Sequence, residues 1–175
     1  MKYLLTLLLV LPVIFSLHSF ARAAEVDTTF AVVTYSGIDR LREFNKKVGA
    51  SIGFGFGFGS DRAGTPEETT RKQVDHLIGR VQEILDMRPE RLHFRIEILN
   101  SSKEVQAIYL KEYGQKVNFI AFYSPRRETI YVGLNKLQRT VFAHEIAHAV
   151  IDRYFDKAPP VKVHELLAQY VEKQL

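Results

Sequence analysis

Residues 141–151 constrain the fold of this chain more than any other stretch. Their sequence, Val-Phe-Ala-His-Glu-Ile-Ala-His-Ala-Val-Ile, is apolar on nearly every side of a helix, and a helix that is apolar all round is buried. His144 and His148 lie on one face of this helix, one turn apart, with Glu145 beside them. Burying two imidazoles and a carboxylate is costly unless each group finds a partner. The stretch therefore predicts a buried helix whose three polar side chains share a partner.

A divalent metal ion is the partner that suits all three groups. Two neutral imidazoles four residues apart on a helix can both bind one Zn²⁺, and the adjacent glutamate can take a proton from a water molecule at the metal. We therefore predict that His144 and His148 bind one zinc ion per chain, with Glu145 as general base. The alternative is a pair of core histidines satisfied by hydrogen bonds. His76 and His93 lie outside any ligand spacing and are interpreted as ordinary histidines.

The N-terminus predicts an exported protein. Lys2 gives a short positive start, and the apolar run over residues 3–15 is too short to span a bilayer comfortably. Ala21 and Ala23 then form a small-x-small cleavage pattern, so residues 1–23 are interpreted as a signal peptide. We expect a periplasmic or extracellular protein without stable membrane insertion; a retained membrane anchor is the alternative. Cysteine is absent from the sequence, so no disulfide stabilises the exported chain.

Charge and size narrow the class of protein further. Lysine and arginine number 24 against 20 aspartates and glutamates, and the basic residues are scattered rather than clustered. This balance argues against a nucleic-acid partner. After removal of the signal peptide, the chain has the length of one domain. The sequence does not indicate an oligomeric state.

The sequence of the N-terminal segment, residues 24–62, predicts secondary structure but offers few candidate functional residues. Residues 29–35 are rich in β-branched and aromatic side chains and predict a strand, and residues 38–48 predict a short amphipathic helix. Glycine and phenylalanine alternate over residues 53–59. A phosphate-binding loop would need a lysine and a hydroxyl at its end, which this segment lacks. We interpret it as a pliable aromatic loop, with a flap over an active-site cleft as the alternative.

Residues 63–175 predict an α+β domain with a small mixed sheet. Thr65 and Pro66 form a helix start, and that helix should run to about Met87. Asn135 is predicted to cap the motif helix, which should end near Phe155. The other expected elements are strands at 92–99, 117–123 and 129–133, and helices at about 102–114 and 161–174. A helical bundle is the rival fold, and it would require all three strand predictions in this region to be wrong.

A third metal ligand cannot come from the motif helix. Asp152 continues the row of His144 and His148, but it lies about 12 Å along the helix axis from His144, so it can at most support the site. The last helix has an apolar stripe and an opposite side with polar residues. The stripe contains Val163, Leu166, Leu167, Tyr170 and Val171, and the opposite side contains Glu165, Ala168, Gln169 and Glu172. The pattern does not by itself decide whether that opposite side faces solvent or a metal cleft. The small Ala168 and the position of Gln169, which could orient a ligand histidine, favour the cleft.

The motif His-Glu-Ile-Ala-His, followed by Glu-Leu-Leu-Ala-Gln-Tyr at 165–170, resembles the gluzincin zinc metallopeptidases, specifically the small secreted type. The resemblance covers roughly residues 65–175. It implies a zincin-like single domain with a backing helix, a motif helix and a C-terminal helix that bears the third ligand, here Glu165. Glu172 is the nearest substitute for that ligand. Many gluzincins carry an acidic residue one turn after the ligand glutamate, where this chain has Gln169.

The resemblance also implies a function, hydrolysis of peptide bonds in a peptide or protein substrate. Glu145 would take a proton from the attacking water and pass it to the leaving amine. Three tyrosines are candidates for a hydrogen-bond donor to the oxyanion, namely Tyr123, Tyr131 and Tyr170. The alternative function is that of a secreted zinc-containing binding module or a catalytically degenerate peptidase homologue. Because the chain has no cysteine and offers three ligands, we expect an open metal site and an active enzyme.

Overall fold

The fold is built from five strands and five α-helices within residues 23–49 and 64–175, which are the residues that the computed structural model describes. Almost all of the expected signal peptide, and the Gly/Phe segment at 53–59, lie outside these residues. The strands are β1 (Ala24–Asp27), β2 (Ala31–Tyr35), β3 (Phe94–Leu99), β4 (Ala121–Ser124) and β5 (Thr129–Gly133). The helices are α1 (Ile38–Val48), α2 (Pro66–Leu85), α3 (Ser102–Tyr113), α4 (Arg139–Tyr154) and α5 (Val161–Gln174).

The five strands form one mixed sheet in the order β1-β2-β3-β5-β4. β2, β3 and β5 are parallel, whereas the edge strands β1 and β4 pair antiparallel with their neighbours. In the register of the central strands, Ile96 lies between Val33 of β2 and Ile130 of β5, and all three side chains are fully buried. β2 and β3 alternate buried apolar residues with less buried ones, whereas all five residues of β5 are buried. The sheet confirms the predicted α+β class and excludes the helical bundle.

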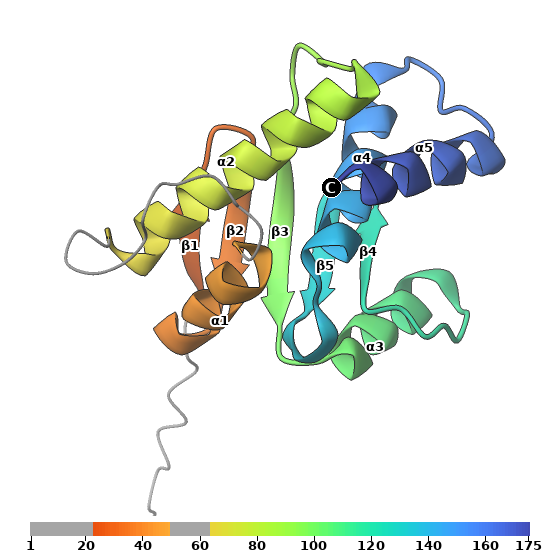
Figure 1. Cartoon of the computed structure of the whole chain (residues 1–175). Helices are drawn as coiled ribbons and strands as arrows, with labels where there is room; N and C mark the ends of the chain where they lie inside the picture. The colour runs from red at the N-terminus through yellow and green to blue at the C-terminus, as the bar shows by residue number, and fades with distance from the viewer. Residues whose placement is uncertain (1–22, 50–63) are drawn as a thin grey trace, which may run out of the picture.

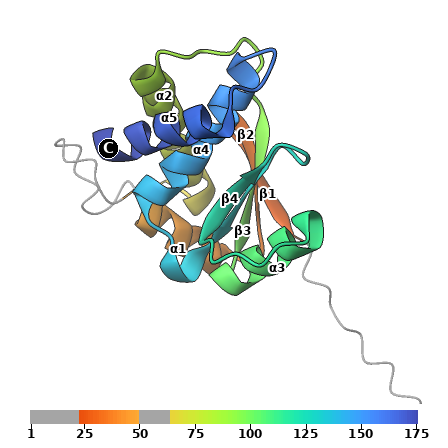
Figure 2. The ribbon, with the colours of Figure 1, turned by 90° about the vertical axis from the view of Figure 1, so that its right-hand side faces the viewer.

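Helices cover the two faces of the sheet unequally. α1, α2, α4 and α5 lie on one face, and α3 covers the other face beside β4 and β5 (Figures 1 and 2). The main core lies under the four helices, where Phe44 of α1 and Phe142 of α4 meet edge to face with ring centroids 5.4 Å apart. A smaller cluster under α3 is formed by Val105, Phe122 and Tyr131. The motif helix α4 is therefore a central element of the larger layer.

The long helix α2 begins as its sequence predicts. The Thr65 side chain accepts a hydrogen bond from the Glu68 backbone N–H at 3.2 Å, and Pro66 occupies the first turn. The helix ends at Leu85, slightly before the expected Met87, because Asp86 adopts the left-handed conformation with φ 52°. A left-handed residue just after the last turn is a common helix terminator. α2 packs against both α1 and α4 and so supports the motif helix from behind.

The predicted start of the motif helix is wrong. Asn135 belongs to a short 3₁₀ helix, Leu134–Lys136, and α4 begins only at Arg139 after Gln138. The Asn135 carboxamide oxygen instead accepts a hydrogen bond from the Ser102 backbone N–H at 2.9 Å and so caps α3. The partner of this side chain lies 33 residues away in the chain, so local spacing could not reveal it.

β2 and β3 each start two residues later than expected, at Ala31 and Phe94. Two other strands differ more from the sequence expectation. β1 was not predicted, because its residues Ala-Glu-Val-Asp carry two acids and only Val26 is buried. β4 starts at Ala121 rather than at residue 117. The chain before it is held in an irregular path by Gln106, whose side-chain amide donates to Asn118 Oδ1 and to the Phe119 carbonyl. The second of these hydrogen bonds satisfies a backbone carbonyl that would otherwise pair in a strand ladder.

Gly133→Ala is expected to lower the free energy of unfolding by about 1–3 kcal/mol. β5 passes so close to the start of α3 that a Cβ at Gly133 would lie 2.5 Å from the Ser102 backbone nitrogen. Gly79→Ala in α2 is the matched control, because a Cβ there meets nothing within 4 Å. It should raise the free energy of unfolding by roughly 0.5–1 kcal/mol. Urea unfolding of both variants measures the difference, and equal stabilities would contradict the close approach.

Candidate metal centre

The two motif histidines share the side of α4 that faces α5. The remaining sides of α4 are packed, and Ile146, Ala147 and Val150 are fully buried. The side chains of His144 and His148 retain 18% and 15% of their exposure. Their Nε2 atoms lie 3.2 Å apart, which the i, i+4 spacing makes possible. The helix thus holds two imidazoles at the surface of the core, turned toward the same point.

α5 brings the third group to that point. The helix packs on α4 through Ala168 and Val171, both fully buried, so the two helices approach closely. The predicted apolar stripe of α5 is wrong in three positions, since Val163, Leu166 and Tyr170 are 41%, 58% and 49% exposed. The contact with α4 takes one residue from each predicted side, Ala168 and Val171, and Glu165 lies at its border with a side chain that is 48% exposed.

His144, His148 and Glu165 come together as a group that could hold a metal ion. Glu165 Oε2 lies 3.6 Å from His144 Nε2, and Glu165 Oε1 lies 3.5 Å from His148 Nε2. One ligand atom from each residue lies within 4.8 Å of the others. Two imidazole nitrogens and a carboxylate oxygen are a donor set that a divalent cation takes in proteins, so the residues fit such an ion. Neither His76 nor His93 belongs to this group, and both are exposed.

The surroundings of His148 favour its neutral form, which is the form that binds metals. The pKa of His148 is lowered to about 3, chiefly by burial and also by the nearby His144 and His164. A neutral imidazole keeps a lone pair free for a cation. His148 therefore needs no proton to be removed near neutral pH.

Glu145 is buried beside the histidines and is held by the edge strand. Its Oε2 accepts a hydrogen bond of 2.8 Å from the backbone N–H of Tyr123 in β4. The pKa of Glu145 is raised to about 8, chiefly by burial; the Tyr123 N–H acts against this rise, and the nearby Glu165 and Glu172 contribute to it. Its other oxygen, Oε1, has no hydrogen-bond partner among the residues that the structure describes. The carboxylate is thus fixed at one oxygen and available for proton transfer at the other.

In the metal-free protein, Glu145→Gln is expected to raise the free energy of unfolding by on the order of 2–4 kcal/mol at about pH 9. The folded protein holds a proton on Glu145 up to a pKa of about 8, whereas an ordinary glutamate releases it near 4.5. The stabilising contribution of the Glu145 proton is therefore complete below the pKa that this group has in the unfolded protein. It is lost as the pH rises through the pKa that the group has in the folded protein. Glutamine does not titrate and can still accept from the Tyr123 N–H.

Urea unfolding in the presence of a chelator, at about pH 4 and about pH 9, measures this effect. The substitution should have little effect at the lower pH, where both the folded and the unfolded wild-type protein carry the proton. A Glu145→Gln variant that is no more stable than the wild type at the higher pH would contradict the burial of this carboxylate.

Sequence reasoning did not predict where two residues near the metal centre, Glu172 and His164, would lie. Glu172 Oε2 lies 3.5 Å from His144 Nδ1, on the side away from the metal group. His164 Nδ1 lies 3.3 Å from His148 Nδ1. Gln169, which was expected to orient a ligand histidine, is exposed and makes no hydrogen bond to either histidine. The spacing of Glu172, seven residues and two turns after Glu165, could have indicated it, but nothing in the local pattern marked His164.

A cleft of about 550 Å³ opens over the metal group. One wall is aromatic and comes from α3, β4 and the segment between them, where Tyr109 meets both Phe119 and Phe122 edge to face. The opposite wall is formed by Pro159 and Val161 at the start of α5. The metal group and Glu145 line the same cleft. The cleft therefore combines a polar centre with apolar walls, which is the composition of a site for a small ligand or chain segment.

The three candidate tyrosines lie in different places. Tyr123 lines the cleft, but its hydroxyl donates to Asp152 Oδ2 at 3.0 Å, and burial raises its pKa. Tyr131 is buried on the other face of the sheet under α3, and the half-exposed Tyr170 does not line the cleft. Asp152 also lines the cleft, where it holds the Tyr123 hydroxyl rather than a ligand histidine.

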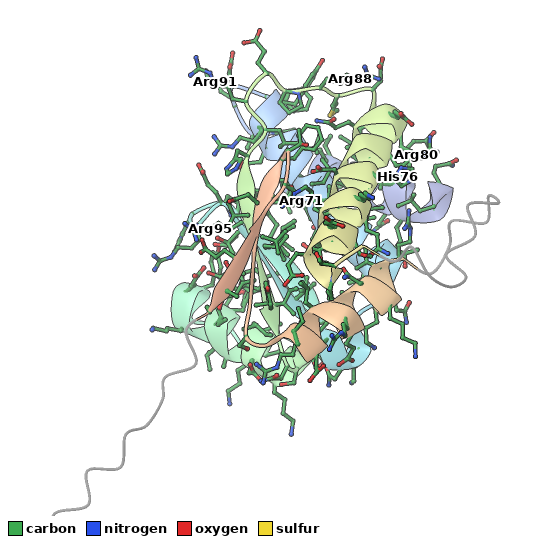
Figure 3. All side chains as sticks on the ribbon, turned by 90° about the vertical axis from the view of Figure 1, so that its left-hand side faces the viewer. Arg71, His76, Arg80, Arg88, Arg91 and Arg95 are labelled. Carbon is green, nitrogen blue, oxygen red and sulfur yellow. The ribbon has the colours of Figure 1, made fainter. Side chains whose placement is uncertain are left out.

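Basic side chains on the β1–α2 side of the molecule are spread over α2, the segment after it and β3 (Figure 3). Arg71 Nε donates to the Asp27 carbonyl at 2.9 Å, and Arg95 lies 3.5 Å from Glu25. His76 lies on the exposed side of α2, far along the chain from the motif. This side contributes no residue to the metal group.

Comparisons with protein-family models, with curated proteins and with solved structures found no match. Among the helices of residues 23–49 and 64–175, none combines the length and apolar character needed to cross a membrane.

Proposed function

We propose that the chain is an exported zinc-dependent peptidase of the gluzincin type. One observation carries the proposal, namely that three potential ligands and a buried, oriented glutamate line the same cleft. The order of elements supports the relation to that class, because a backing helix (α2), a mixed sheet, the motif helix (α4) and a glutamate-bearing helix (α5) follow one another. The expected signal peptide supports export.

His144, His148 and Glu165 would hold the zinc ion. A structural zinc site is usually closed by four protein ligands, often including cysteine, whereas a catalytic site keeps one position open. This chain has no cysteine, and the group contains three residues among those that the structure describes. The donor set therefore supports an open site. When bound, zinc would polarise a substrate carbonyl and make a water molecule easier to deprotonate.

Glu145 moves the proton in this proposal. Its Oε2 is held by the Tyr123 N–H, so Oε1 is the oxygen that can accept a proton from the attacking water. Burial raises the pKa of this carboxyl in the metal-free protein. A zinc cation beside it would favour the ionised form that acts as the base, and the leaving amine would then take the proton from it. The edge strand that fixes Glu145 thereby sets the direction of proton transfer.

The outer edge of β4 supports an extended peptide as the substrate. Within the described residues β4 is the last strand of the sheet and pairs only with β5, and the Tyr123 N–H on its outer edge donates to Glu145 in the cleft. Ala121 is two residues earlier, so its backbone groups point to the same side. An extended peptide can pair with a free strand edge of this kind, and such pairing recognises main chain rather than sequence. The apolar walls of the cleft would accommodate the substrate's side chains.

The second candidate function is that of a secreted zinc-containing binding module. The observation that favours it is the apolar surface of α5 next to the cleft, where Val161 and Leu166 are 78% and 58% exposed. Exposed apolar surface of this kind often marks an interaction site. Such a module would need neither a buried Glu145 nor a fixed direction for it, which is why the peptidase is preferred.

Incubation of the mature protein with a diverse peptide library tests the proposal. We expect cleavage of peptide bonds that stops when a zinc chelator is added and returns when zinc is restored. A parallel metal analysis should find about one zinc per chain. Stoichiometric zinc without any cleavage would favour the binding module, and cleavage that persists in chelator would contradict the metal mechanism.

A further inference from the structure

His164 stands immediately before the proposed ligand Glu165, in the first turn of α5, and faces the ligand His148. The two Nδ1 atoms are 3.3 Å apart, the ring centroids are 5.5 Å apart, and the ring planes differ by only 23°. The distance between the ring centroids exceeds the distance between the two Nδ1 atoms by about twice the radius of an imidazole ring. Such a difference arises only when both Nδ1 atoms lie close to the line that joins the two ring centres. The rings therefore meet edge to edge, nearly in one plane. This is hydrogen-bond geometry rather than face-to-face stacking.

A metal at His148 determines where the protons lie in this pair. His148 turns its Nε2 toward His144 and Glu165, so metal binding there requires its proton to sit on Nδ1. That N–H can donate only to a nitrogen with a free lone pair. His164 must then carry its own proton on Nε2 and accept at Nδ1.

His148 has no other acceptor for this proton within residues 23–49 and 64–175. Asp152 also lines the cleft, but its Oδ2 accepts from the Tyr123 hydroxyl, and Gln169 is exposed on a different side of α5. Glu172 Oε2 lies 3.5 Å from Nδ1 of the other ligand histidine, His144, although that nitrogen makes no hydrogen bond among the residues described. His164 is therefore the acceptor on α5 that faces His148.

We infer that His164 is a positioning residue, an inference that rests on the proposed metal function. It accepts a hydrogen bond from Nδ1 of His148 and so fixes the tautomer and the ring orientation in which His148 binds zinc. In return it is held with its proton on Nε2, the nitrogen directed away from His148.

Zinc affinity measured by competition with a chromogenic chelator tests the positioning role. His164→Ala should bind zinc about 10–100-fold more weakly than the wild type, because a group that orients a metal-ligating histidine typically has an effect of this size. His164→Asn should restore most of the affinity, since its carboxamide oxygen takes the place of Nδ1. His164→Gln, whose amide reaches the place of Nε2, should not. His76→Ala on the exposed side of α2 is the matched control and should leave the affinity unchanged.

Nitrogen NMR of the zinc-loaded, unaltered protein tests the tautomers without any substitution. We expect the proton on Nδ1 of His148 and on Nε2 of His164, with a His148 ring N–H protected from exchange. A proton on Nδ1 of His164, or full zinc affinity in His164→Ala, would overturn the inference while leaving the proposed function intact. A wild-type protein that takes up no zinc would instead overturn the proposed function, and this inference with it.

Discussion

Replacing Glu145 by glutamine is expected to lower kcat for peptide cleavage by about 10²–10⁴-fold while zinc stays bound. Glutamine has the shape of glutamate and can still accept the 2.8 Å hydrogen bond from the Tyr123 N–H, so the cleft should keep its form. It cannot take a proton from water. The expected loss is therefore in the chemical step, with KM little changed.

The measurement is a steady-state assay on the library peptide that the wild type cleaves fastest, together with metal analysis of the same preparation. Glu90→Gln, an exposed glutamate after α2, is the matched control and should cleave at the wild-type rate. If Glu145→Gln cleaved as fast as the wild type with its zinc in place, another group would have to be the base.

Replacing Glu165 by alanine is expected to remove zinc from the purified protein. The substitution takes away one of three ligands and leaves two imidazoles, whose Nε2 atoms are 3.2 Å apart, without an anionic partner on the metal side. We expect the zinc content to fall from about one per chain to nearly none after dialysis against a weak chelator. Activity should fall with it.

Glu172→Ala is the matched control for this result, because Glu172 lies on the same helix and faces the other nitrogen of His144 at 3.5 Å. It should retain zinc under the same dialysis, with an affinity about 10–100-fold weaker than that of the wild type. The reverse outcome, with zinc lost in Glu172→Ala and kept in Glu165→Ala, would make Glu172 the third ligand.

The sequence by itself determined the elements whose pattern is local and strong. The bounds of α1 and α5 agree with the ranges expected from their sequence, 38–48 and 161–174, and β5 with 129–133. Thr65 caps α2 as predicted. In each case residues close together in the sequence determine where the element lies, through apolar periodicity, a helix cap or a turn. The same is true of His144 and His148, because i, i+4 spacing places two side chains together on any helix.

Other features depend on contacts between residues far apart in the chain, and local patterns could not supply them. Asn135 caps a different helix from the one expected, because its partner Ser102 is brought beside it only by the sheet. β1 forms as an edge strand because β2 offers it a partner, although its own sequence is weakly β-like.

Only the tertiary structure decided what faces the metal group. The helical wheel of α5 favoured burial of Val163, Leu166 and Tyr170, yet these remain exposed. Close packing on α4 through Ala168 and Val171 instead brings the half-exposed Glu165 to the border of the contact, beside His144 and His148. That orientation also brings His164 to His148. A sequence pattern shows which residues share a side of a helix, but the neighbouring helix determines which side is covered, and so which residues complete the site.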